Sequence, residues 1–131
     1  MVPFSDIPAS TERIAKQIID AAFVVNHELG PGLLESIYEA CLCEELRRAG
    51  VGLERQKDLP VRYKGQPLET GLRLDLIVEG VVIVEIKAVV ALLPIHKAQL
   101  MTYLKLTDTR LGLLINFNEA LLKDGIRRVV F

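Results

Sequence analysis

Residues 74–88, LDLIVEGVVIVEIKA, predict a β-hairpin at the centre of a sheet, because leucine, isoleucine and valine fill most of its positions. Two carboxylates, Asp75 and Glu85, and the ammonium group of Lys87 interrupt this apolar pattern. Burying an ionised group carries a large free-energy cost unless the group is paired or binds a metal. These three charges therefore indicate either a buried ion pair or a functional site.

Alternation along a strand places Glu85 and Lys87 on the same face as Val81 and Ile83. Asp75 lies on the preceding strand, and two carboxylates that converge across a hairpin form an oxygen-rich pocket suited to Mg²⁺. A lysine on the same face can orient or deprotonate a water, or stabilise negative charge in a transition state. The alternative is a buried salt bridge between the lysine and one of the acids, and the spacing alone leaves both interpretations open.

The length of the hairpin loop decides whether the two acids can meet. A tight two-residue loop at Glu79-Gly80 would place Asp75 opposite Val84, so that it points away from Glu85. A shared site needs Asp75 opposite Glu85, which requires a three-residue loop over 79–81 or a bulge. A functional site therefore predicts a departure from the simplest hairpin.

Length and composition predict one globular domain over residues 1–131. Half of the residues are hydrophobic and a quarter are charged, with 16 lysines and arginines against 17 acids and a net charge of -1. A protein that holds nucleic acid by bulk charge is usually basic. Any contact with nucleic acid must therefore use a local basic patch.

A cytoplasmic location is expected from the ends, the apolar runs and the cysteines. The N-terminus, MVPFSDIPAS, lacks the pattern of a secretory signal, and the run AVVALLPI is far shorter than the ~20 residues of a membrane helix. Cys41 and Cys43 point ~200° apart on a helix, so they cannot together form a disulfide or bind a metal. Both are expected to be buried thiols in a reducing compartment.

The remaining pattern predicts an α/β fold, a mixed β-sheet flanked by helices in the order α-α-β-β-β-α-β, with IRRVVF as a final edge strand. The first helix is expected over about 10–29, with Ser10 or Thr11 as its cap, and the second between Gly32 and Gly50. The other expected elements are a strand containing Leu59, Val61 and Tyr63, a turn at Lys64-Gly65, a helix from Pro94 to about Leu106, and a buried strand RLGLLINF.

Polar residues on two helices are further candidates for the site. His96, Gln99 and Tyr103 fall on one face of the helix that follows the hairpin, although a single histidine there is typical of an ordinary structural residue. Glu35 lies three residues before Tyr38 near the start of the second helix. It either stabilises the helix dipole or supplies a third acid to the pocket.

Three blocks of the sequence together resemble the GxxExxY protein family. GLLESIY carries the G-x-x-E-x-x-Y signature at Gly32, Glu35 and Tyr38, and the other blocks are LDLIVEGVVIVEIKA and HKAQLMTYL. That family is similar to a small branch of the PD-(D/E)XK nuclease superfamily, which has a restriction-endonuclease-like core. The resemblance covers the chain from about residue 12 onward.

The resemblance implies roles for individual residues. Asp75, Glu85 and Lys87 match the D…E-x-K core of the superfamily, and Leu74 stands where the motif name has proline. Glu35 matches an acid that many members place on a helix before the sheet. Gln99 with Tyr103 matches a Q-x-x-x-Y element of the exonuclease-like branch, and the two residues would orient the site or contact phosphate.

The resemblance therefore implies a nuclease that uses Mg²⁺ or Mn²⁺ to hydrolyse phosphodiester bonds of nucleic acid, with DNA as the expected substrate. Asp75, Glu85 and Glu35 would hold the metal, and Lys87 would position the attacking water. The alternative is a catalytically silent binding or assembly module, favoured by the near-neutral charge, the seven aromatic residues and the absence of tryptophan. The apolar segment 88–95 beside the site also predicts a homodimer.

Overall fold

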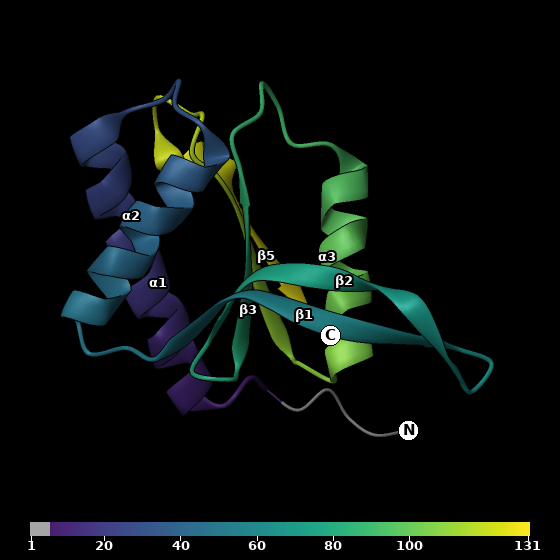
Figure 1. The fold of residues 1–131 in the computed structure, drawn as a ribbon. Helices are drawn as coiled ribbons and strands as arrows, with labels where there is room; N and C mark the ends of the chain where they lie inside the picture. The colour runs from purple at the N-terminus through teal and green to yellow at the C-terminus, as the bar shows by residue number, and fades with distance from the viewer. Residues whose placement is uncertain (1–5) are drawn as a thin grey trace.

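The computed structural model describes residues 6–131 as a five-stranded mixed sheet between two layers of helices, which confirms the predicted α/β class (Figure 1). Helices α1 and α2 cover one face, and α3 covers the other. The elements are α1 (Ala9–Leu29), α2 (Glu35–Arg48), β1 (Leu53–Tyr63), β2 (Gln66–Val78), β3 (Val82–Lys87), α3 (Pro94–Thr107), β4 (Leu111–Asn116), a short 3-10 helix η1 (Leu122–Gly125) and β5 (Ile126–Val130).

The strands follow one another across the sheet in sequence order, from β1 to β5. β3 and β4 pair in parallel, and α3 makes the crossover between them, whereas all the other pairs are antiparallel. β5 lies at the edge, as predicted for IRRVVF. The site hairpin is therefore held on its β3 side by the fully buried strand β4.

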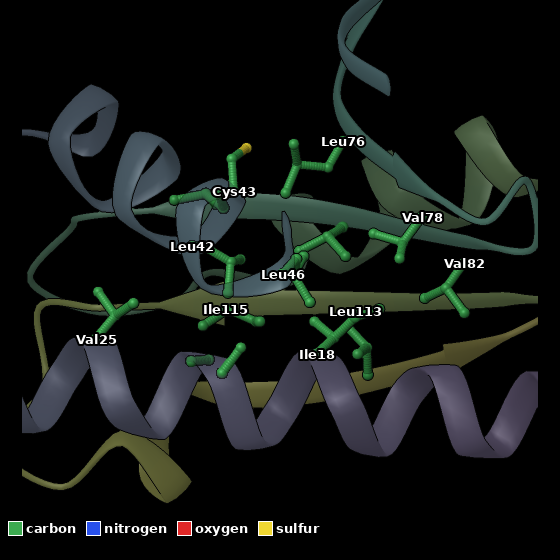
Figure 2. Close-up of a cluster of buried hydrophobic side chains, with 14 of the residues drawn as sticks. Ile18, Val25, Leu42, Cys43, Leu46, Leu76, Val78, Val82, Leu113 and Ile115 are labelled. Atoms are coloured by element: carbon green, nitrogen blue, oxygen red, sulfur yellow. The ribbon is translucent and has the colours of Figure 1, made fainter. Parts of the chain in front are cut away.

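β3 is buried on both faces, which explains the nearly continuous apolar run in its sequence. Val82, Val84 and Ile86 belong to the core beneath α1 and α2, while Ile83 belongs to the smaller core beneath α3. Figure 2 shows the larger core, where side chains of α1 and α2 meet the sheet. The labelled residues there include Ile18, Val25, Leu42, Leu46 and Leu113.

The hairpin between β2 and β3 has the register that a shared carboxylate site requires. Val78 lies opposite Val82 and Leu76 lies opposite Val84, so the loop is three residues long, over 79–81. Extending this register by one position brings Asp75 opposite Glu85. The predicted departure from a two-residue loop is confirmed.

The long β1-β2 hairpin extends beyond the rest of the sheet (Figure 1). We call its outer part, residues 57–72, the arm. β2 pairs with β3 only over 76–78, whereas it pairs with β1 from end to end. The arm turns at Lys64-Gly65, as predicted, with φ values of 49° and 79°.

Three details of the predicted elements were wrong or incomplete. β1 begins at Leu53, earlier than the predicted strand. Its first residues were not predicted, because most side chains of this edge strand are exposed and do not show the alternation that marks a half-buried strand. Neither Ser10 nor Thr11 caps α1, since Pro8 is its N-cap and Thr11 is buried. The helix η1 was not predicted.

Two further expectations concern the thiols and the membrane. Cys43 is buried, Cys41 is half-buried, and both are free. Within residues 6–131, no helix has the length and apolar character needed to cross a membrane. Residues 1–5 lie outside the described part of the chain, and they form the first half of the segment MVPFSDIPAS, in which no secretory signal was expected.

Candidate metal and active site

Asp75 of β2 and Glu85 of β3 are joined across the hairpin. The backbone N–H of Ile86 donates a hydrogen bond to Asp75 Oδ2 at 2.8 Å, and the backbone N–H of Asp75 donates to Glu85 Oε1 at 3.4 Å. Each carboxylate therefore accepts a bond from the opposite strand. This exchange fixes the two acids side by side where the hairpin joins the sheet.

Glu85 is almost completely buried, with 6% of its surface exposed. Burial, followed by the negative charge of Asp75, raises the pKa of the Glu85 carboxyl to about 9. At neutral pH and without a cation, Glu85 therefore retains a proton. A cation bound between the two acids would remove the cause of their repulsion and displace that proton.

Glu35 and Lys87 approach the same place from two elements. Glu35 is the first residue of α2, and Lys87 is the last residue of β3. Burial raises the pKa of the Glu35 carboxyl, the positive charge of Lys87 lowers it, and the negative charge of Asp75 raises it. No ion pair of the described chain joins Lys87 to Asp75 or Glu85, so the alternative of a buried salt bridge is not what the structure shows.

The donor chemistry of the pair suits a hard divalent cation. Carboxylate oxygens are the ligands that Mg²⁺ takes from proteins, and Mg²⁺ usually keeps several waters beside one or two carboxylates. In residues 6–131, no three His, Cys, Asp or Glu side chains form a group that could hold a metal ion together. Asp75 and Glu85 thus form a two-carboxylate pair, and Glu35 stands near this pair without completing a triad.

Helix α3 brings a third set of polar groups toward the pair. Tyr103 is buried, and its phenol pKa is raised by burial and by the charges of Glu85 and Asp75. A hydrogen bond with the exposed Gln99 lowers the same pKa. Gln99 and Tyr103 therefore form a bonded pair on the side of α3 that faces the acids.

His96 has a different role from its neighbours on α3. Its Nδ1 accepts a hydrogen bond from the backbone N–H of Leu93 at 3.0 Å, at the position where the helix begins. This contact satisfies a backbone donor that the helix leaves without a partner. The structure thus explains His96 by helix capping.

The signature residues Gly32 and Tyr38 stabilise the loop between α1 and α2, which leads directly to Glu35. Tyr38 is fully buried and stacks on Phe117, with ring centroids 4.9 Å apart. Its hydroxyl donates to the carbonyl of Gly30 at 2.6 Å and accepts from the backbone N–H of Leu33 at 3.1 Å. Gly32 has a φ of 101°, which residues with a Cβ rarely adopt.

Asn116 fixes the chain directly after Lys87. Asn116 is fully buried, its Oδ1 accepts from the N–H of Val89 at 3.0 Å, and its Nδ2 donates to the carbonyl of Val89 at 2.9 Å. The backbone N–H of Phe117 donates to the carbonyl of Lys87 at 2.9 Å. The end of β3, and with it the origin of the lysine side chain, is therefore tied to β4.

A pocket of about 380 Å³ opens beside Asp75 and Glu35, and part of its wall consists of residues that the sequence did not indicate. Its floor includes Glu39, which is 5% exposed and bonded to both Arg55 and Gln56. No pattern singled these residues out, because charged residues on a helix and an edge strand resemble an ordinary solvated surface. The lining residues are Leu34, Glu35, Ser36, Glu39, Gln56 and Asp75.

A family model described as the PD-(D/E)XK nuclease superfamily matches residues 12–129. The match spans nearly the whole chain, and it includes most of α1, all of α2, the site hairpin and α3. The chain belongs to the PD-(D/E)XK nuclease superfamily. No curated protein and no solved structure matched the sequence.

Proposed function

We propose that the protein is a metal-dependent nuclease that hydrolyses phosphodiester bonds, with DNA as its substrate. The observation that carries the proposal is the pair formed by Asp75 and Glu85 across the hairpin, with Lys87 two residues further along the same strand. The pair would hold Mg²⁺ or Mn²⁺, with Glu35 as an additional ligand acting through water. The bound ion would supply Lewis-acid stabilisation of the phosphate oxygens.

The other polar groups have roles consistent with their positions. Lys87 shares a strand face with Glu85, so we assign its ammonium group to holding the nucleophilic water and offsetting negative charge on the phosphate. Gln99 donates or accepts beside Tyr103, and we assign this pair to orienting the phosphate. His96 is not needed in this scheme.

The arm offers the local basic patch that a chain of net charge -1 needs for nucleic acid. At its tip, Arg62 and Lys64 flank Tyr63, whose side chain is 63% exposed. Neither cation belongs to an ion pair of the described chain, whereas Lys57 pairs with Glu54 and Arg73 pairs with Asp58. Arg62 donates to the carbonyl of Gly65, and Lys64 Nζ lies 5.4 Å from the centre of the Tyr63 ring. Cations without a carboxylate partner beside an exposed aromatic ring are suited to phosphates and to stacking on bases.

We also propose that the protein is a cytoplasmic homodimer. The segment after Lys87 exposes three apolar side chains, with exposed fractions of 93% for Val90, 55% for Leu93 and 65% for Ile95. A second copy that covered this segment would remove these side chains from water. Light scattering at micromolar protein concentration should give the mass of a dimer, and a monomeric mass would remove this part of the proposal.

The nuclease proposal is tested by incubating single-stranded DNA, double-stranded DNA and RNA with the protein and Mg²⁺ or Mn²⁺. We expect cleavage that EDTA abolishes and that Lys87→Ala reduces to background. Lys105→Ala, which removes an exposed lysine from the last turn of α3, is the matched control and should keep full activity. Binding of these substrates without cleavage by the wild type would favour the silent-module alternative.

A further inference from the structure

The side chains of β2 change from one face of the sheet to the other at Asp75. Leu76 and Val78 pack in the core beneath α1 and α2, whereas Leu72 and Leu74 pack in the core beneath α3. In a regular strand these four residues would share one face, because side chains alternate with a period of two. The change of face falls between Leu74 and Leu76, so Asp75 is the residue at which the strand turns.

The partner strand has an unusual backbone at the same level. Arg55 pairs with Leu76 and Lys57 pairs with Leu74, which places Gln56 opposite Asp75. Gln56 has a φ of 51°, in the left-handed region that residues other than glycine, asparagine and aspartate rarely enter. Such a conformation persists only where the surroundings hold it, and strained residues of this kind cluster at active sites and ligand clamps.

Glu39 supplies the contacts that hold this conformation. The Nε2 of Gln56 donates to Glu39 Oε1 at 2.7 Å, and the Nε of Arg55 donates to Glu39 Oε2 at 2.6 Å. One buried carboxylate on α2 thereby fixes two successive residues of β1. The contact between Arg55 and Glu39 is an ion pair whose carboxylate partner is almost fully buried.

The change of face in β2 explains how side chains from both faces of the sheet come close to Asp75. Glu85 and Tyr103 lie on the α3 side, yet the charge of Asp75 also affects Glu35, which belongs to α2 on the other side. A regular strand would direct Asp75 toward α3 alone. At the turning point, Asp75 lies between the two layers.

We propose that Glu39 and Gln56 are positioning residues, which hold β1 in the left-handed turn that presents Asp75 to the cation site. The cation itself rests on the proposed function. Glu39 and Gln56 do not belong to the D…E-x-K motif, and they would act without touching the metal or the substrate.

Two substitutions at Gln56 separate the backbone from the side chain. Gln56→Gly removes the bond to Glu39, but glycine adopts the left-handed conformation without support, so this variant should bind Mn²⁺ within about threefold of the wild-type affinity. Gln56→Val disfavours that conformation because its side chain is β-branched. It should weaken Mn²⁺ binding by about tenfold or more, as expected when the support of a metal ligand is lost.

Hydrogen exchange gives a readout that does not depend on metal. The backbone N–H of Ile86 donates to Asp75, so its exchange in metal-free protein reports whether the carboxylate is in place. Gln56→Val should accelerate exchange at Ile86 by about tenfold relative to the N–H groups of β4, and Gln56→Gly should leave it unchanged. Lys57→Val, the same substitution one residue away, is the control and should behave as wild type.

The outcomes distinguish this inference from the proposed function. Normal Mn²⁺ affinity and normal Ile86 exchange in folded Gln56→Val would overturn the positioning role. Altered Ile86 exchange in a protein that binds no Mn²⁺ would support the positioning role and refute the metal site. If Gln56→Val does not fold, Gln56→Ala provides the same comparison, because alanine disfavours the left-handed region more mildly.

Discussion

Glu85 is buried directly against Asp75, and burial together with the charge of Asp75 keeps the Glu85 carboxyl protonated at neutral pH unless a cation lies between the two acids. The repulsion adds to the cost of burial and raises the pKa of Glu85 to about 9. The backbone N–H of Ile86 donates to Asp75 and the backbone N–H of Asp75 donates to Glu85, so two hydrogen bonds hold the pair together across the hairpin. In the metal-free protein, Glu85 therefore holds a proton at the position proposed for the cation.

Glu85→Gln should change how the stability of the metal-free protein depends on pH. The folded carboxyl has a raised pKa of about 9 against an ordinary value of 4.5, so the folded state holds the extra proton between these values. This group thus lowers the stability of the wild type progressively as the pH rises from about 4.5 to about 9. Chemical denaturation from pH 5 to 9 should show this loss in wild type and a smaller loss in the variant. Equal slopes for the two proteins would contradict the raised pKa.

Tyr38→Phe should destabilise the fold without touching the acids. The variant keeps the ring stacked on Phe117 but loses the bonds of the hydroxyl to Gly30 and Leu33, at a cost of about 1–3 kcal/mol. Urea denaturation measures this difference. Tyr63→Phe removes an exposed hydroxyl from the arm tip and should cost less than about 0.5 kcal/mol. A Tyr38→Phe protein as stable as wild type would argue against a structural role for the signature tyrosine.

Neutralising the arm tip should weaken nucleic-acid binding in a salt-dependent manner. Arg62→Ser with Lys64→Ser should lower the affinity for duplex DNA, measured by anisotropy without cleavage in Ca²⁺, and should reduce the salt slope by about 2. Lys123→Ser, on η1 outside the arm, should leave the slope unchanged. A slope that is insensitive to the arm variant would exclude the tip from the binding surface.

The sequence predicted the sheet and the register of its central hairpin for a physical reason. Buried strands need apolar residues on both faces, and Asp75 and Glu85 are tolerable there only if they meet, which sets the loop length. The sequence pattern also predicted the helix after the hairpin and the edge position of IRRVVF. The two acids thus made the hairpin loop predictable, because an isolated buried charge would have been costly.

The parts that could not be predicted depend on contacts between distant segments. The left-handed φ of Gln56 is not encoded by its residue type, since glutamine has no preference for that region. Glu39 lies on a helix with many other charged residues, and only the fold shows that it is buried against β1. The polar start of β1 was missed for a different reason, because an exposed edge strand lacks the alternation of apolar and polar residues that reveals a half-buried strand.

The most direct test of the central claim is calorimetric titration of the metal-free protein with Mn²⁺ at pH 7.5, in buffers of different ionisation enthalpy. We expect saturable binding by the wild type with release of about one proton, because the ion displaces the proton of Glu85. Asp75→Ala should abolish the binding, and Glu85→Gln should abolish the proton release. Absence of Mn²⁺ binding by the wild type at millimolar concentration, or equal proton release by wild type and Glu85→Gln, would contradict a cation site at Asp75 and Glu85.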